Sequence, residues 1–285
     1  NEDFLSRFEL EYQLYGALRA RRYDLIVHLS EQPRGAWLAR ALGARYGVAP
    51  VVPGQGDFWS KSFTHLFPLL RNGRRHQVES NLDALRRIGI QPAAEERGVQ
   101  FVPGAAADAR VAALLAGERL GEHGYIHMHP ASRWSFKCWP AERNAELIDR
   151  LSSGHRVVLT AAPDADEMAL VGQILSHARS KPLSLAGSLS IKELGALAAR
   201  ARLFIGVDSM PMHLAAAMGT PTVALFGPSG EEEWRPWRVA HRIVASGHAC
   251  RPCGNDGCGG GKVSECLTTL PLEAALSAVD SLLAR

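Results

Sequence analysis

Polar residues with the strongest chemical signal follow an apolar run at 203–207, in the stretch LFIGVDSMPMHLAAAMGTPTVALFGPS. Pro211 suits the first turn of the alanine-rich helix expected next, because its missing N–H would be unpaired there. The two residues after Pro211 keep N–H groups that we expect to bind an anion. A carboxylate repels a bound diphosphate, so Asp208 is expected to bind sugar hydroxyls instead. The alternative is that Asp208 and Ser209 only cap the helix.

A second polar loop, HPASRWSFKCWP at 129–140, also lies between an expected strand and an expected helix. Lys137 follows Arg133 by four residues and is one of only five lysines, against 27 arginines. Its compact ammonium can neutralise a leaving diphosphate. A solvated basic loop is the alternative. No Asp-x-Asp or His-rich pair lies nearby, so catalysis by a divalent metal is not expected.

Two further loops follow expected strands. The loop TAAPDADE at 160–167 places Glu167 where acidic residues of dinucleotide-binding folds accept hydrogen bonds from a ribose. The alternative is that Asp164, Asp166 and Glu167 only favour the start of the next helix. After the following strand, Gly187-Ser188-Leu189 can leave backbone groups free for the edge of a base.

Residues 58–78 contain no acidic residue but combine basic and aromatic side chains. Such a segment suits an anionic amphiphilic acceptor or an acidic membrane surface. The alternative is an exposed loop with a few core aromatics. The basic residues expected to bind the acceptor are Lys61, Arg74, Arg75 and His76.

Four of the five cysteines fall within 250–266, in the spacing Cys250-x2-Cys253-x4-Cys258-x7-Cys266. Four thiols can hold a tetrahedral zinc, although the usual pair of CxxC knuckles is absent. Free, reduced thiols are the favoured interpretation, because a secreted disulfide framework would spread its cysteines along the chain.

Composition excludes several classes. The 285 residues are 46% hydrophobic and 21% charged, which is typical of a globular chain with room for about two domains. A net charge of +3 is too small to indicate a nucleic-acid binder. No apolar window approaches the ~18 residues of a membrane span, and the sequence Asn-Glu-Asp-Phe at the start predicts no export signal.

Short aliphatic runs alternate with helical patterns along the chain, which predicts parallel sheets covered by helices. The expected strands are 23–29, 45–51, 99–102, 125–129, 156–160, 183–186, 203–207, 222–226 and 243–245. The expected helices are 4–21, 33–42, 76–88, 105–116, 141–153, 165–179, 190–200, 211–218 and 272–284.

Glycines near 117–124 place a domain boundary at residue 118. We expect an N-terminal acceptor-side domain over 1–118 and a nucleotide-sugar domain of about five strands over 119–270. The C-terminal helix, 271–285, is expected to pack back toward the N-terminal domain. The helix at 4–21 has no strand before it, so the opening βα units of the first domain are expected to be missing from this chain.

Together these stretches resemble the ADP-heptose:lipopolysaccharide heptosyltransferases, glycosyltransferase family 9. The resemblance rests on YDLIVHLSEQ, FWSKSFTHLFPL, RRHQVESNLDALRRIGI, SRWSFKCWP, VVLTAAPDADE, FIGVDSMPMHLAAAMGTPTVALFGPS and the block ending in EEWRPWR. It implies an α/β GT-B fold, in which two Rossmann-like, doubly wound domains face a cleft. It also implies inverting transfer of heptose from ADP-L-glycero-D-manno-heptose to a heptose of the lipopolysaccharide inner core, without a required metal or other cofactor.

The resemblance also implies roles for single residues. Lys137 matches a lysine that contacts the donor phosphates, and Asp208 an acid that contacts the heptose, so these two are the expected catalytic residues. The expected donor-binding set is Ser132, Arg133, Lys137, Glu167, Leu189, Asp208, Ser209, Met210 and His213.

Two features depart from the family pattern. The four-cysteine segment is not general in it, and the opening Gly-Asp loop that supplies the general base has no counterpart here, so the base is expected upstream of Asn1. The family implies a cytoplasmic protein that works at the inner face of the inner membrane, on a lipopolysaccharide acceptor, with no nucleic-acid partner and no transmembrane segment.

Three other functions fit parts of the sequence. A sugar-nucleotide epimerase shares the two-domain design, but it does not need the basic segment at 58–78. A two-lobed sugar-binding protein would normally be exported. A zinc-ribbon nucleic-acid module is disfavoured by the small net charge and by the single CxxC pair.

Overall fold

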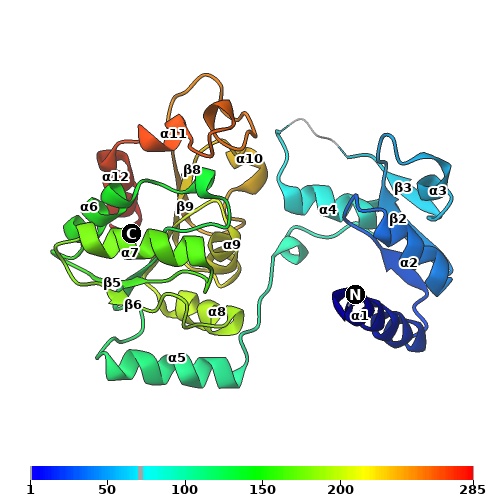
Figure 1. Ribbon diagram of the computed structural model, residues 1–285, viewed down its shortest axis with the longest axis horizontal. Helices are drawn as coiled ribbons and strands as arrows, with labels where there is room; N and C mark the ends of the chain where they lie inside the picture. Colours follow the sequence, from blue (N-terminus) through cyan, green and yellow to red (C-terminus); the bar gives the residue numbers. More distant parts are fainter. Residues whose placement is uncertain (1, 70–72, 285) are drawn as a thin grey trace. The chain divides into compact units, whose positions relative to one another are not determined.

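The computed structural model describes residues 2–69 and 73–284. The chain forms two compact units, of which the first ends at Arg97 and the second begins at Gly98 (Figure 1). This division differs from the expected boundary at residue 118. The reason is that the helix at 105–117 packs on the helix at 191–200 and so belongs to the second unit.

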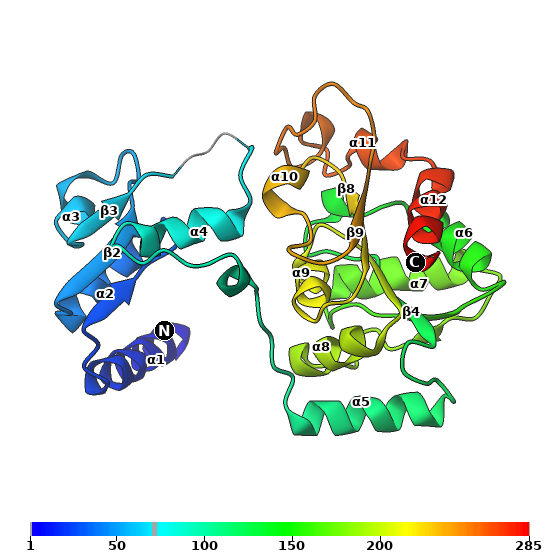
Figure 2. The same ribbon diagram turned by 180° about the vertical axis from the view of Figure 1, so that it is seen from behind.

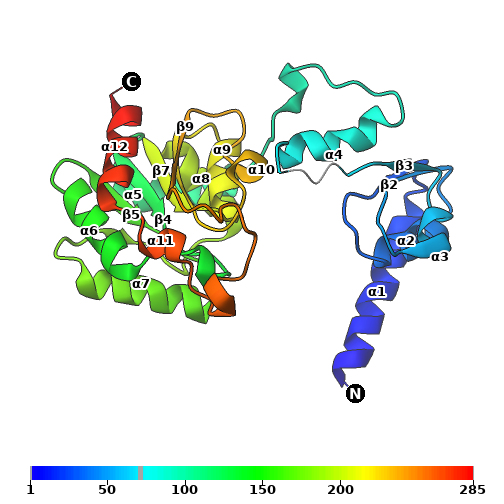
Figure 3. The same ribbon diagram turned by 90° about the horizontal axis from the view of Figure 1, so that it is seen from above.

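The first unit contains a small parallel sheet whose strands pair in the order β1-β2-β3. The helix before β1 contacts the helix after it (Figure 3). The elements of this unit are α1 (Glu2–Ala20), β1 (Leu25–Val27), α2 (Arg34–Leu42), β2 (Tyr46–Pro50), α3 (Gly56–Ser60), β3 (His65–Phe67), α4 (Gln77–Arg86) and a 3-10 turn (Glu95–Arg97).

Aromatic residues of the 58–78 segment form much of the core of the first unit. Trp59 and Phe63 pack with Ala36 and Ala49, and Phe67 packs with other residues on the sheet. The indole N–H of Trp59 donates to the carbonyl of Pro50 at 2.9 Å, so its one polar group is satisfied where it is buried. The alternative interpretation, in which a few of these aromatics belong to the core, is therefore supported for Trp59, Phe63 and Phe67.

The second unit is a six-stranded, all-parallel sheet in the order β6-β5-β4-β7-β8-β9. Its strands are β4 (Tyr125–His129), β5 (Arg156–Leu159), β6 (Leu183–Ser184), β7 (Leu203–Val207), β8 (Thr222–Phe226) and β9 (His241–Ala245). Its helices are α5 (Ala105–Gly117), α6 (Ala141–Leu151), α7 (Ala165–His177), α8 (Ile191–Arg200), α9 (Met210–Ala217), α10 (Glu231–Trp234), α11 (Glu265–Thr268) and α12 (Leu272–Leu283), with 3-10 turns at Ser135–Lys137 and Cys258–Gly260.

Helices cover both faces of this sheet because alternate residues of each buried strand point to opposite sides. Ile126 and Met128 of β4 pack with residues of α6, α7 and α12, whereas Tyr125 packs with α5 and α8. Helices α6 and α12 lie side by side on the first of these faces (Figure 2). The chain thus forms a doubly wound unit.

Strands β4, β5 and β6 are added toward one edge of the sheet, and β7, β8 and β9 toward the other. The switch point therefore lies between β4 and β7, which are neighbours in the sheet although β5 and β6 come between them in sequence. Ligands of such sheets bind outside the carboxyl ends of the strands at this switch point. The loops that follow β4 and β7 are 130–134 and 208–209, the two stretches with the strongest chemical signal in the sequence.

Two further differences from expectation have physical causes. Residues 99–102 are no strand: Val99 and Val102 are exposed in the connection between the units, where no strand pairs with them. The strand β3 was not expected, because its three residues are too few to show alternation. Helix α12 places Ala275 and Val279 in the core of the second unit, and its packing toward the N-terminal domain stays a prediction.

Among the helices of the described residues, none is both long and apolar enough to cross a membrane.

Candidate functional site

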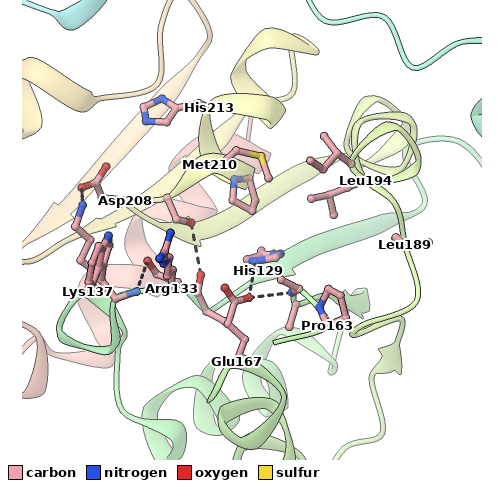
Figure 4. Close-up of a pocket in the computed structure, with 18 of the residues that line it drawn as sticks. His129, Arg133, Lys137, Pro163, Glu167, Leu189, Leu194, Asp208, Met210 and His213 are labelled. Atoms are coloured by element: carbon pink, nitrogen blue, oxygen red, sulfur yellow. Dashed lines mark hydrogen bonds and ion pairs between the residues drawn. The ribbon is translucent and has the colours of Figure 1, made fainter. Parts of the chain in front are cut away.

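A pocket of about 540 Å³ lies at the switch point of the second unit (Figure 4). It gathers all nine residues that were expected to bind a donor, from the loops after β4 and β7, from the start of α9, from α7, and from the loop before α8. The pocket is lined by His129, Ala131, Ser132, Arg133, Trp134, Lys137, Ala161, Ala162, Pro163, Glu167, Leu189, Ile191, Leu194, Asp208, Ser209, Met210, Pro211, His213 and Trp234.

Lys137 and Asp208 form an ion pair at the carboxyl ends of β4 and β7. The ammonium Nζ donates to Oδ2 of Asp208 at 2.7 Å, although 71 residues separate them in sequence. The Asp208 side chain is 6% exposed and that of Lys137 is 24% exposed, so water screens the pair only in part. An ammonium and a carboxylate are thus held together on the wall of the pocket.

The position of Lys137 is fixed by the residues on either side of it. Phe136 is buried, and its carbonyl accepts a hydrogen bond of 2.7 Å from the hydroxyl of Ser264. Trp139 is also buried, and its indole N–H donates to the carbonyl of Leu270 at 3.3 Å. The aromatic residues that flank the lysine in sequence therefore anchor its loop, and they do so on the chain that precedes α12.

The start of α9 settles how Asp208 and Ser209 are used in this structure. Ser209 occupies the N-cap position, but its side chain makes no capping hydrogen bond, and the carboxylate of Asp208 goes to Lys137. The capping alternative therefore finds no support. The N–H of Met212 donates to the carbonyl of Ser209 at 3.1 Å, so the expectation of a free N–H there was wrong.

Glu167 points into the pocket from the first turn of α7 and is 8% exposed. Asp164 caps this helix by accepting hydrogen bonds from the N–H groups of Asp166 and Glu167. The helix-start interpretation therefore holds for Asp164, whereas Glu167 remains the candidate for the ribose. Oε2 of Glu167 accepts from the N–H of Ala162 at 2.9 Å and lies 3.6 Å from Nε2 of His129. Contact with His129 and the Ala162 hydrogen bond hold the pKa of Glu167 below its usual value, against the effect of burial.

One end of the pocket is apolar. Leu189 contributes to it as expected, together with Pro163, Ile191 and Leu194, which were not predicted. The helix α8 that carries two of these residues begins with a capping box between Ser190 and Glu193. That Ser-x-x-Glu signature was present in the sequence, and it marks the helix whose first turns line the site.

His129, Trp134 and Trp234 are further lining residues that were not predicted. Trp234 comes from the block EEWRPWR, where the resemblance pointed, and its ring lies 6.2 Å from that of His213 in an edge-on arrangement. His129 was missed because it reads as the last residue of a buried strand.

The residues expected to bind an acceptor lie in the first unit. Lys61 pairs with Asp57 at 2.7 Å on the surface, and Arg75 makes two hydrogen bonds to Asp83, at 2.6 and 2.9 Å. His76 is buried and caps α4 by accepting from the N–H of Val78. Arg74 lies in the loop before α4. An acceptor role for these four residues stays a prediction.

All five cysteines are free thiols. Within the described part of the chain, no three His, Cys, Asp or Glu side chains are grouped so that they can hold a metal ion, so the zinc site at Cys250, Cys253, Cys258 and Cys266 finds no support. Cys138 lies beside the pocket loop, where burial raises the pKa of its thiol to about 11. A thiol with that pKa is almost fully protonated at neutral pH.

Residues 12–263 match the sequence profile described as glycosyltransferase family 9 (heptosyltransferase). The chain is 41% identical over 229 residues to lipopolysaccharide heptosyltransferase 3 of Escherichia coli. The matched segment covers 79% of this chain and 66% of that protein. The chain therefore spans just under two thirds of the length of that relative.

Two solved structures share the fold. One is a glycosyltransferase family 9 protein of Veillonella parvula, with a TM-score of 0.80 at 20% identity, covering 95% of this chain and 77% of the other. The second is the ADP-heptose lipopolysaccharide heptosyltransferase II of E. coli, with a TM-score of 0.73 at 22% identity, covering 95% and 80%. These likenesses confirm the predicted GT-B class, with parallel sheets in two units.

Proposed function

This chain belongs to glycosyltransferase family 9, and we propose that it serves the transfer of heptose from ADP-L-glycero-D-manno-heptose to an inner-core heptose of lipopolysaccharide. Its likeness to a protein of E. coli that is named a lipopolysaccharide heptosyltransferase supports the proposal. The observation that carries the proposal is the Lys137–Asp208 pair at the switch point of the second unit. Such a pair offers one group of each charge to a donor that has an anionic and a hydroxyl-rich part.

Lys137 is assigned to the diphosphate. When the bond between the heptose and the diphosphate breaks, negative charge grows on the leaving ADP, and a preorganised ammonium stabilises that charge. Arg133 and Ser132 line the same part of the pocket and can share the phosphate oxygens. Because these side chains supply positive charge and donors, we propose that the transfer needs no divalent metal.

Asp208 is assigned to the heptose. A carboxylate accepts hydrogen bonds from sugar hydroxyls and repels phosphate, and here Lys137 compensates its charge. The start of α9, with Ser209, Met210 and His213, lines the same pocket and is assigned to the donor as well.

The nucleoside is assigned to the far end of the pocket. An adenine ring fits against the apolar side chains of Leu189, Ile191 and Leu194, and burial of its faces would contribute most of the binding there. Glu167 then accepts hydrogen bonds from the ribose hydroxyls. Its pKa, held below the usual value, keeps it charged at neutral pH and so able to accept them.

The acceptor is assigned to the first unit, with Lys61, Arg74, Arg75 and His76 as candidate contacts for a phosphorylated core sugar. Lys61 and Arg75 already pair with carboxylates of this unit, so a phosphate of the acceptor would compete with Asp57 and Asp83 for them. The proposed acceptor, lipopolysaccharide, is a membrane glycolipid, and we propose that the transfer takes place at the cytoplasmic face of the inner membrane.

Thermal shifts with four ligand types test the proposal. We expect ADP and ADP-heptose to raise the melting temperature, and UDP-sugars and free sugars to leave it unchanged. A shift with UDP-sugars instead would favour the sugar-nucleotide epimerase, and a shift with free sugars alone a sugar-binding protein. Heptose transfer from ADP-heptose to core lipopolysaccharide, unchanged by EDTA, would complete the test.

A further inference from the structure

Two buried histidines that the proposed reaction does not use lie behind the carboxylate of Glu167. His127 and His129 both belong to β4, and the hydroxyl of Thr160, just after β5, lies between their rings. Nε2 of His127 is 2.8 Å from Thr160 Oγ1, and Nδ1 of His129 is 2.9 Å from the same oxygen. All three residues are at most 3% exposed, so water does not compete for these contacts.

The far side of the His129 ring faces Glu167, with Nε2 3.6 Å from Oε2 (Figure 4). Four side chains therefore form one row, from His127 through Thr160 and His129 to Glu167. The distance to Glu167 is longer than a normal hydrogen bond, so this last contact acts through the attraction of an N–H for a negative charge.

A hydroxyl has one hydrogen to give, so it donates to one ring and accepts from the other. If Thr160 donates to Nδ1 of His129, the proton of that ring sits on Nε2 and points at Glu167. Thr160 then accepts from Nε2–H of His127, and Nδ1 of His127 carries only a lone pair.

Both ends of the row favour this order of protons. Nδ1 of His127 is buried and has no hydrogen-bond partner among the described residues, and an unpaired lone pair is better tolerated there than an unpaired N–H. In the opposite order, His127 would bury an unpaired N–H, and His129 would turn a lone pair toward the carboxylate. Burial, with His129 nearby, lowers the pKa of His127 to about 3, so this ring is neutral and carries one proton.

We propose that Thr160 and His129 are positioning residues, which set an N–H against Oε2 of Glu167 and so leave its Oε1 turned to the nucleotide. This inference rests on the proposed function, in which Glu167 binds the ribose. A carboxylate that is 8% exposed needs such compensation to stay charged and in place. The N–H of Ala162 supplies one hydrogen bond to this carboxylate, and the N–H of His129 adds a second favourable contact.

Thr160→Val tests the proposal, because this change keeps the volume and removes the hydroxyl from a residue that does not line the pocket. We expect the Kd for ADP to rise about tenfold, the scale of one hydrogen bond to a charged group, with kcat changed less than about twofold. Thr222→Val is the matched control: its buried hydroxyl donates to the carbonyl of Thr220 at 2.9 Å, away from Glu167. The control should leave the Kd unchanged.

A double-mutant cycle with Glu167→Gln shows whether Thr160 acts through Glu167. We expect Thr160→Val to cost less than about twofold in ADP affinity once Glu167 carries no charge. Any one of three results would overturn the inference. Thr160→Val could bind ADP as tightly as the wild type, Thr222→Val could lose as much ADP affinity as Thr160→Val, or the losses of Thr160→Val and Glu167→Gln could be fully additive. Affinity for ADP in the wild type, with no loss in Glu167→Gln, would instead refute the assigned role of Glu167.

The pKa of Glu167, followed by carbon NMR of its carboxyl group, gives a readout that does not depend on ADP. The titratable groups that face it are His129 from β4 and Cys138 from the loop after β4. Thr160→Val should raise this pKa toward its ordinary value, because the N–H of His129 would no longer be held against the carboxylate, and Thr222→Val should leave it unchanged. An unchanged pKa of Glu167 in Thr160→Val would refute the inference, whether or not the protein binds ADP. A failure of the wild type to bind ADP would refute only the proposed function.

Discussion

Lys137 pairs with Asp208 on the wall of the pocket, and the loop that carries it is anchored on both sides. Lys137→Ala should therefore remove one preorganised charge and lower kcat/KM for heptose transfer by about 10²-fold or more. Steady-state kinetics with ADP-heptose measure this. Lys181→Ala, an exposed lysine that does not line the pocket, is the control and should be neutral. Near-normal kcat/KM in Lys137→Ala would defeat the assignment to the diphosphate.

Asp208 differs from Lys137 in the part of the donor that it is proposed to bind. Asp208→Asn should abolish most heptose transfer, because the amide accepts sugar hydrogen bonds poorly and leaves the Lys137 ammonium unpaired. ADP binding should be retained, since ADP has no heptose and the freed ammonium can turn to its phosphates. Calorimetry with ADP and a transfer assay separate the two effects. Collapse of ADP affinity along with activity would mean that the residue supports the site structurally.

At the scale of the element, helix α4 owes its place to a cluster of charges. Arg75 and Arg86 both bond to Asp83, and Arg86 and Arg97 bond to Glu79. Burial tends to raise the pKa of Glu79, but the arginines outweigh it and lower the pKa below its ordinary value. A carboxylate with a lowered pKa stabilises the fold above its unfolded pKa, and that stabilisation is lost as the pH falls through the folded pKa.

Glu79→Gln should accordingly lower the free energy of unfolding by about 1.5–3 kcal/mol at pH 7, the range for hydrogen bonds to charged groups. The difference from the wild type should shrink as the pH falls below the ordinary range of Glu, about 4.3. Urea unfolding at a series of pH values measures it. Glu146→Gln, which breaks only the exposed pair with Arg143, should cost next to nothing. A constant deficit at every pH would argue against a charge effect.

The four-cysteine segment, 250–266, is an element whose pattern suggested metal binding without any support in the structure. Heptose transfer needs a base and stabilisation of the leaving group, and these thiols lie outside the pocket. Cys250→Ser with Cys253→Ser should leave kcat and KM unchanged in the folded protein. Elemental analysis of protein purified without added metal checks occupancy, and loss of turnover in a folded double variant would show that the segment takes part.

At the scale of the whole molecule, every residue that lines the pocket comes from the second unit, 98–285. A fragment of that unit should therefore bind ADP with a Kd within about threefold of the full chain, as expected of a domain with its own core. It should not transfer heptose, since the proposed acceptor contacts are in the first unit. Circular dichroism controls for folding. A folded fragment that fails to bind ADP would show that the first unit contributes to the nucleotide site.

Much of the second unit could be predicted from sequence. Strands β4, β7 and β8 have the predicted bounds, because buried parallel strands are continuous aliphatic runs that end at polar loops. The first unit was harder. Its three-residue strands β1 and β3 are short, and its aromatic and basic residues alternate in a segment where core and surface roles look alike.

The sequence by itself determined which loops carry the chemistry. Residue type and position after a strand were enough to select Lys137, Glu167 and Asp208, since the carboxyl ends of parallel strands share one edge of a sheet. It could not determine that Lys137 and Asp208 pair with each other, because β4 and β7 become neighbours only through the strand order. For the same reason only the tertiary structure decided that His129 stands beside Glu167, and that Arg75 and His76 are held by partners within α4. Side-chain partners that are distant in sequence are set by packing, and no local pattern records them.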